Sequence, residues 1–317
     1  MHKNKVLNWC GLLMAALALI WFGSQLVKYS TVFDELSIQA IGYIVLSAAT
    51  YIISAIITGT SWGLLLRGVG ETRLSLNRVV SISCLAQIGK YLPGNVAHHI
   101  GRVVLAQKHN LSIYTTSFTI FIETVWVIAI AALLALVAIW AVGSSVFNEI
   151  PNLPHWWVLT VLISSAMLAP LVGHKLFDRA ARWWAIRKGK KFQPVRLPSL
   201  RVFWLVGILY AANFMILGLV LQIIASYIFS AQSGNILLLS GIFAVAWIVG
   251  FITPGAPAGL GVREVVLVAA LTPVYGNEPA IGIAAVLRVV TVLGDGLSFL
   301  LGICLDRISK SDVKAGF

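Results

Sequence analysis

The amino-acid sequence predicts an all-α integral membrane protein with about six full spans and two re-entrant pairs of half-helices, arranged as a four-plus-four inverted-topology repeat. Three observations carry this prediction: the apolar composition, a Pro-Gly pattern that occurs twice, and the uneven distribution of Lys and Arg. Of 317 residues, 59% are hydrophobic and 11% are charged, and the mean hydropathy is +0.92. A soluble domain carries about 25% charged residues, so this composition excludes a large soluble core.

Apolar runs long enough to cross a bilayer core, which takes about 20 residues, recur along the chain. Hydropathy predicts full spans at about 6–27, 40–66, 114–142, 156–173, 202–230 and 279–304. The first run follows a basic N-terminus, as in a signal peptide, but it is too long and has no small-residue cleavage site. We therefore expect this run to be retained, and residues 1–317 to form a single transmembrane domain.

Two other apolar segments are interrupted. They lie at about 79–92 and 235–253, and each stops at a Pro-Gly pair, Pro93-Gly94 in the first and Pro254-Gly255 in the second. Polar side chains follow each pair and would not be stable against lipid. Irregular backbone at membrane depth is tolerated only where it is buried in protein or lines a water-filled cavity. Each segment is therefore expected to be a re-entrant pair of half-helices that enters and leaves on one side.

The two interrupted segments share a sequence pattern. Residues 89–102 read GKYLPGNVAHHIGR and residues 250–263 read GFITPGAPAGLGVR, so both are G-x3-P-G-x7-R, at an offset of 161 residues. Because the flanking spans keep almost the same offset, we expect a first repeat at about 6–142 and a second at about 156–304. Secondary transporters build midplane sites from broken helices in such repeats. The alternative is a chance pair of Pro-Gly breaks among eight ordinary spans.

Lys and Arg are concentrated on one side of the predicted spans. The linker 174–201, inside the second repeat, holds nine of them against one acid, which predicts a cytoplasmic location. Both termini then also lie in the cytoplasm, and the opposite loops contain a single Lys or Arg, Lys28. Aromatic residues alternate with basic ones in 175–191, a pattern typical of a surface helix that binds anionic lipid headgroups. Beside a span, lipid is a better partner than nucleic acid.

Ionisable residues near the two breaks form the candidate site, because a charge at the bilayer centre costs about 2.5–3.5 kcal/mol and usually marks a function. The expected substrate-binding residues are Lys90, His98, His99, Arg102, Arg263 and Arg288. The expected charge-compensating or coupling residues are Glu123, Glu264 and Asp295. The expected hinges at the re-entrant breaks are Pro93, Gly94, Pro254, Gly255, Gly259 and Gly261. Four cations against three acids are expected to attract an anion.

Phosphate or carboxylate is the ligand that these breaks favour. The helix that follows a break presents unpaired N–H groups and the positive end of its dipole. Arg102 and Arg263 each lie about two turns beyond a break, so we expect them to add a bidentate guanidinium to the same anion.

Some of the charged residues have a second interpretation. Asp295 lies two helical turns after Arg288, so these two residues could simply neutralise each other. Glu123 is either the counter-ion of a cation such as Arg102 or a protonatable coupling residue. The two adjacent histidines either relay protons or lie at the membrane surface, and without further ligands they do not indicate a metal site.

Residues 89–102 together with TPGAPAGLGVREVVL, residues 253–267, resemble the transmembrane flippase region of the lysylphosphatidylglycerol synthetase/flippase family, in which K-Y-x-P-G and P-G-x-x-G-x-R-E segments recur. The resemblance covers essentially the whole chain and implies a stand-alone member without the soluble synthetase domain. The matching positions are Lys90, Pro93, Gly94 and Arg102 in the first motif and Pro254, Gly255, Gly259, Gly261, Arg263 and Glu264 in the second. The inserted Ala256-Pro257-Ala258 departs from the shorter glycine-rich turn of the family.

The combined prediction is a flippase that moves an anionic or zwitterionic lipid across the cytoplasmic (inner) membrane of a bacterium. The resemblance implies an aminoacyl-phospholipid, a glycolipid or a polyprenyl-phosphate-linked sugar as substrate. The sequence has no catalytic or nucleotide-binding motif, so neither an enzyme nor a cofactor is expected. Two alternatives are a membrane-embedded lipid-phosphate transferase with His98 or His99 as base, and a non-transporting scaffold of a lipid or glycan assembly complex. The sequence leaves open whether the chain forms a homo-oligomer or binds a lipid-modifying enzyme.

Overall fold

The computed structural model describes residues 20, 22–28, 38–92, 96–140, 196–232 and 234–315, with isolated positions between 157 and 189. Within these ranges the chain forms helices and connecting turns and contains no strand. The predicted all-α class is confirmed for the described part of the chain.

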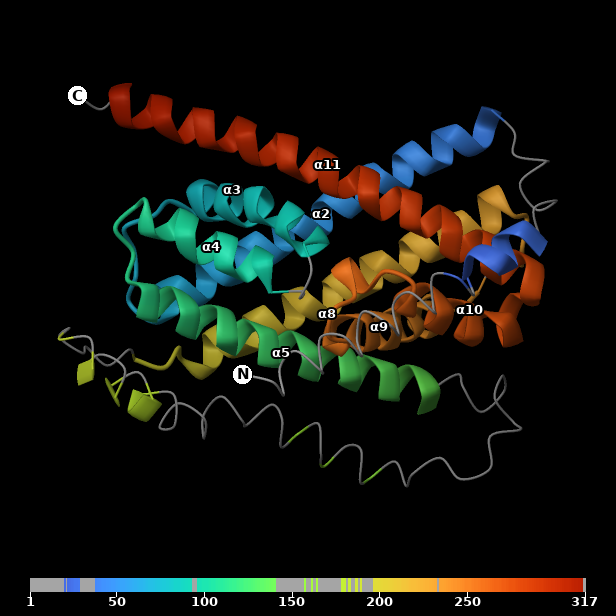
Figure 1. The fold of residues 1–317 in the computed structure, drawn as a ribbon, viewed down its shortest axis with the longest axis horizontal. Helices are drawn as coiled ribbons and strands as arrows, with labels where there is room; N and C mark the ends of the chain where they lie inside the picture. Colours follow the sequence, from blue (N-terminus) through green and yellow to red (C-terminus); the bar gives the residue numbers. More distant parts are fainter. Residues whose placement is uncertain are drawn as a thin grey trace.

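The helices follow one another in two series of similar order. The first series comprises α2 (Ile38–Gly68), α3 (Leu76–Ala86), the 3-10 turn η2 (Gln87–Tyr91), α4 (Ala97–Gln107) and α5 (Ile113–Ala138). The second comprises α8 (Leu200–Ile223), the π turn η4 (Ile224–Ile228), α9 (Ile236–Ile252), the 3-10 turn η5 (Pro257–Gly259), α10 (Val262–Tyr275) and α11 (Asn277–Ala315). Each series begins and ends with a long helix and has a 3-10 turn between two shorter helices (Figure 1).

Five helical segments of the described chain are long and apolar enough to cross a membrane. They are Ile38–Gly68, Ile113–Ala138, Leu200–Ile228, Pro257–Tyr275 and Asn277–Ser309. Four of them coincide with spans that hydropathy predicts. The other, Pro257–Tyr275, lies in the second interrupted segment, and the helix before it, Ile236–Ile252, is shorter. The protein is therefore a multi-pass membrane protein.

Several sequence predictions fall on parts of the chain that the structure does not describe. The predicted spans at 6–27 and 156–173 and the basic linker 174–201 lie mostly outside the described residues. The hinge pair Pro93-Gly94 lies outside them as well.

Side-chain caps explain where the interior helices begin. The hydroxyl of Ser75 accepts a hydrogen bond from the N–H of Arg78 at the start of α3, and Ser112 does the same for Thr115 at the start of α5. The side chain of Asn235 accepts from two N–H groups in the first turn of α9. These oxygens pair N–H groups that have no partner within the helix, which matters most where water is scarce.

The first interrupted segment bends earlier than the sequence indicates. The α-helix ends at Ala86 and the chain continues as the 3-10 turn η2 to Tyr91. Helical structure resumes at Ala97, so Arg102 lies in the second turn of α4.

The second interrupted segment has a longer irregular stretch. Helix α9 ends at Ile252, close to the predicted break, but α10 does not begin until Val262. The backbone between them has positive φ at four positions, Gly255 (82°), Ala258 (51°), Gly259 (69°) and Gly261 (79°). Left-handed backbone cannot continue a right-handed helix, so the restart is delayed. Arg263 therefore lies in the first turn of α10 rather than about two turns along a helix.

The last helix of each series packs against the first of the two shorter helices in the other series. Helix α11 packs along α3 and α2, and α5 packs along α9 and α8. In Figure 1, α11 runs beside α3, and α5 runs on the other side of the labelled helices beside α9. Helices α2 and α8 pack against each other between these edges, and the turns η2 and η5 are in contact. The two series are therefore interlocked.

Segments that the charge distribution predicts to be cytoplasmic meet at one end of the molecule. Arg78, at the start of α3, forms an ion pair with Asp306 near the end of α11. Gly68, at the end of α2, lies so close to Pro198 that a Cβ on the glycine would be 3.0 Å from the Cβ of the proline. This arrangement agrees with a shared side of the membrane, while the identity of that side stays a prediction.

Candidate functional site

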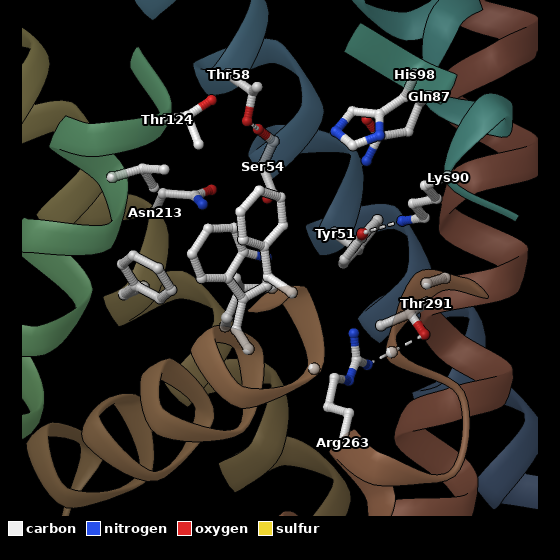
Figure 2. Close-up of a pocket in the computed structure, with 18 of the residues that line it drawn as sticks. Tyr51, Ser54, Thr58, Gln87, Lys90, His98, Thr124, Asn213, Arg263 and Thr291 are labelled. Carbon is white, nitrogen blue, oxygen red and sulfur yellow. Dashed lines mark hydrogen bonds between the residues drawn. The ribbon is translucent and has the colours of Figure 1, made fainter. Parts of the chain in front are cut away.

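A cavity lies where the two series of helices interlock. It has a volume of about 170 Å³, and side chains from every helix and 3-10 turn of the two series line it. All six predicted substrate-binding residues are among them: Lys90, His98, His99, Arg102, Arg263 and Arg288. Figure 2 shows Lys90, His98 and Arg263 around this space, each from a different element. The structure thus brings together residues that lie up to about 200 positions apart in the sequence.

Arg102 and Glu123 form a buried ion pair between α4 and α5. Nη2 of Arg102 lies 2.5 Å from Oε2 of Glu123. The hydroxyl of Tyr210 donates a hydrogen bond to the other carboxylate oxygen. The guanidinium also lies over the ring of Trp62, 4.1 Å from its centroid. Glu123 is therefore the counter-ion of Arg102, which is one of the two roles that the sequence allowed.

Lys90 and Asp295 form a second ion pair, between η2 and α11. Nζ of Lys90 lies 2.7 Å from the carboxylate of Asp295, which is 2% exposed. Tyr91 donates to the same carboxylate at 2.5 Å, and Tyr51 does so at 3.3 Å. Asp295 therefore pairs with Lys90 and not with Arg288, the partner that helical spacing suggested.

Arg288 and Glu264 form a third pair, between α11 and α10. Nη1 of Arg288 lies 3.3 Å from Oε1 of Glu264 and also donates to the backbone carbonyl of Ala258 at 3.3 Å. The second carboxylate oxygen of Glu264 accepts from the N–H of Gly261 at 2.7 Å. Glu264 thus caps α10 and fixes Arg288 at the same time.

Arg263 has no carboxylate partner among the residues that the structure describes. It is 8% exposed, and its Nη2 donates only a long hydrogen bond, 3.5 Å, to the hydroxyl of Thr291 (Figure 2). Its Nε has no hydrogen-bond partner, and its guanidinium lies 5.3 Å from the ring centroid of Phe243. The positive end of the α10 dipole adds to its charge. Because the other three cations are each paired with a carboxylate, one positive charge in the cavity is not balanced by any residue that the structure describes.

The two histidines lie in the cavity wall with buried ring nitrogens. Nδ1 of His98 and both ring nitrogens of His99 find no hydrogen-bond partner in the described structure. Their rings are 3.9 Å apart, and His99 meets the ring of Phe251 edge-on at 6.3 Å. Both rings therefore line the cavity, while a proton relay through them stays a prediction. Among the described residues, no three His, Cys, Asp or Glu side chains are arranged to hold a metal ion.

The wall formed by α8 and α9 is largely apolar. Apart from Tyr210, its aromatic members are Phe214, Phe243, Trp247 and Phe251. Trp247 stacks on Phe251 with ring centroids 5.2 Å apart and contacts Phe214 at 5.8 Å. The cavity therefore combines a cationic wall, made by the breaks and α11, with an aromatic wall.

Several uncharged polar residues of the cavity were missed by the sequence analysis. They are Tyr51, Tyr91, Tyr210, Asn213 and Thr291. Asn213 had a usable signal, because an amide in the middle of an apolar span is costly unless it serves a purpose. Of the predicted hinges in the described chain, Gly259 lines the cavity, and Pro254, Gly255 and Gly261 lie in the irregular stretch around it.

Apolar spanning helices around a cavity lined by four cationic side chains define a multi-pass membrane protein. The sequence profile described as the lysylphosphatidylglycerol synthase TM region matches residues 8–297, so the chain belongs to this family. The family places the protein among membrane proteins with a lipid-related function. A comparison with curated proteins gave no match.

Proposed function

We propose that the protein is a lipid flippase, which moves the headgroup of an anionic or zwitterionic lipid across the cytoplasmic membrane. The observation that carries this proposal is Arg263, a buried guanidinium that no carboxylate of the described structure balances. Leaving a charge buried and unpaired costs several kcal/mol, on the order of 3–5 when a partner is removed. A bound lipid phosphate would supply the missing charge and recover this cost.

The amphipathic lining of the cavity supports a lipid over a small soluble anion. The phosphate would lie at Arg263, and the carbon atoms next to it would lie against Trp247 and Phe251. An inorganic anion would gain nothing from this aromatic wall, whereas a lipid buries apolar surface there.

The packing pattern supports the inverted-topology repeat and the re-entrant breaks. By order along the chain, α2, α3 and α5 of the first series correspond to α8, α9 and α11 of the second. The contact of α3 with α11 then corresponds to that of α9 with α5, and the contact of α2 with α11 to that of α8 with α5. Within the series, the contacts between consecutive helices correspond in the same way, and η2 meets its own counterpart η5. Two series that correspond in this way are the arrangement in which transporters open a central site alternately to each side.

Two ion pairs tie the two breaks to α11 and support a role of this helix in gating. Lys90 with Asp295 ties η2 to α11, and Arg288 with Glu264 ties η5 and α10 to the same helix. In the proposed transport cycle these two pairs break and re-form as the breaks move relative to α11. With no nucleotide-binding motif in the sequence, the lipid gradient or a coupled ion drives the movement. The lipid leaves chemically unchanged, so the proposed activity is transport and not catalysis.

The test is lipid translocation by purified protein in proteoliposomes, together with native mass spectrometry of the lipids that co-purify. We expect Arg263→Gln to lower the translocation rate at least tenfold and to abolish retention of one anionic lipid class. The matched control is Arg307→Gln, which removes an exposed cation near the end of α11 and should change neither readout. An Arg263→Gln variant that translocates and retains lipid like the unaltered protein would refute the proposal.

The same experiment separates the flippase from its alternatives. A transferase that uses His98 or His99 as base would leave a lipid with altered mass after incubation. A scaffold would show neither translocation nor altered lipid, and its co-purifying lipids would be the same with and without Arg263.

A further inference from the structure

A second hollow lies on the outer side of the cavity, between α4 and α5. It has a volume of about 240 Å³ and is more open than the cavity. Its wall is formed by Ile100 and Val103 of α4 and by Ser117, Ile120 and Phe121 of α5, with His99 at its inner end. We refer to this feature as the α4–α5 groove.

His99 belongs to both spaces. Its ring lines the α4–α5 groove and also the cationic cavity. On the cavity side it contacts Phe251, which stacks on Trp247. A row of rings therefore leads from the groove to the aromatic wall of the cavity, and His99 is the only described residue that lines both.

The outer side of the groove is apolar and faces the surroundings of the helix bundle. Ile100 is 58% exposed and Phe121 is 41% exposed. Helix α5 is a candidate span, so lipid and not water surrounds this surface. Neither ring nitrogen of His99 bonds to another described residue, so no hydrogen bond fixes its ring between the two spaces.

We propose that the α4–α5 groove binds the hydrocarbon tail of the lipid whose headgroup occupies the cavity. This inference rests on the proposed function and adds a lateral route to it. The phosphate lies at Arg263, the carbon atoms next to it follow the aromatic wall, and the tail leaves past His99 between α4 and α5. The tail thereby remains in the bilayer while the headgroup crosses inside the protein. His99 is the boundary residue, and the movement of its ring lets the tail pass.

The first test is photo-labelling of the unaltered protein in phosphatidylcholine vesicles with a phosphatidylglycerol that carries a diazirine in one acyl chain. Mass spectrometry of the labelled peptides is expected to place most of the label on Ala97–Gln107 and Ile113–Ala138. The Arg263→Gln variant is expected to reduce this label at least fivefold, because the tail occupies the groove only with the headgroup in the cavity. Label spread evenly over all lipid-facing helices, or unchanged in Arg263→Gln, would show bulk lipid in the groove and overturn the inference.

The second test fills the groove. Ser117→Trp is expected to lower translocation and groove labelling at least fivefold, since the indole occupies the space of the tail. The control is Val137→Trp on the same helix, at an exposed position (41%) outside the groove, which should leave both readouts unchanged. Binding of glycerol 3-phosphate, a headgroup without a tail, is expected to depend on Arg263 and to be the same in Ser117→Trp.

The outcomes keep the two proposals apart. If Ser117→Trp translocates lipid like the unaltered protein while Arg263→Gln does not, the flippase stands and the lateral route fails. If the groove is labelled in an Arg263-dependent way but the unaltered protein translocates no lipid, the tail site stands and the flippase fails.

Discussion

At the scale of single residues, replacing each of the four cavity cations has a different effect on the charge balance of the cavity. Lys90, Arg102 and Arg288 each neutralise a buried carboxylate, so replacing any of them leaves a buried negative charge behind. Loss of transport in such a variant would not distinguish a ligand contact from a structural defect. Arg263 has no such partner in the described structure, so its replacement removes a charge without exposing another. It is therefore the most informative position in the cavity.

Arg102 provides the matching prediction on stability. Arg102→Gln is expected to lower the free energy of unfolding by about 3–5 kcal/mol, because Glu123 would remain buried without its cation. The double variant Arg102→Gln, Glu123→Gln is expected to recover at least half of this loss, since two neutral amides need no counter-charge. Denaturant unfolding in detergent measures the free energy of unfolding of the single and the double variant. Equal losses in the single and double variants would contradict this account.

The sequence predicted which charges gather and offered the pair of Arg102 with Glu123, but it did not predict the partners of Asp295 and Arg288. Ionisable side chains stand out in apolar spans, so all six candidate ligands could be named and all line one cavity. The partner of Asp295 could not be named, because Lys90 lies 205 residues away and reaches it only through the packing of η2 on α11. Arg288 is seven residues from Asp295, about 10 Å along a helix, and the sequence offered no nearer cation. Tyr51 and Tyr91 gave no signal, because tyrosines are common in membrane spans and at their ends.

At the scale of elements, the glycines of the second break position Arg263. Gly259 has a φ of 69°, and a Cβ there would lie 3.1 Å from the Cα of Gly250 on α9. Gly276, after α10, has a φ of 84° but no atom near a Cβ. Both positions therefore require left-handed backbone, but only Gly259 also lies too close to another helix to leave room for a side chain.

This difference gives a paired prediction. Alanine at either position is expected to cost about 1–2 kcal/mol of stability, since a Cβ disfavours left-handed backbone. Only Gly259→Ala is expected to reduce translocation per folded molecule, by severalfold, because it pushes η5 away from α9 next to Arg263. Thermal unfolding and proteoliposome assays report the two effects separately. An equal fall in translocation for Gly276→Ala would count against this role of the close contact.

Sequence patterns located the long helices well and the broken segments less well. Four predicted spans agree with the structure because hydropathy reports directly on burial in lipid. The early end of α3 was missed because a 3-10 turn carries the same apolar residues as the α-helix it continues. The late start of α10 was missed because it depends on the φ values of four residues, including Ala258, whose side chain gives no hint of left-handed backbone.

At the scale of the whole molecule, the charge distribution predicts which ends face the cytoplasm. In a variant without native cysteines, Arg73→Cys and Arg307→Cys are expected to react with a membrane-impermeant maleimide only after the cells are permeabilised. Glu278→Cys, in the first turn of α11, is expected to react in intact cells. The structure places positions 73 and 307 near the ion pair of Arg78 with Asp306, so they should respond alike. Labelling of 73 and 307 from opposite sides would refute the predicted topology.

The interlocked packing of α3 and α11 also affects how the chain is made. Ser81 of α3 donates its hydroxyl to the carbonyl of Gly302 at 2.8 Å, and Arg78 needs Asp306, which lies 228 residues later. At a synthesis rate of about 5–20 residues per second, these polar groups wait about 10–45 s for their partners. During that time the ribosome-bound first half lacks the partners of Ser81 and Arg78. Completion of the last helix is therefore the committed step of assembly, and a chain truncated before α11 would be a substrate for quality-control proteolysis.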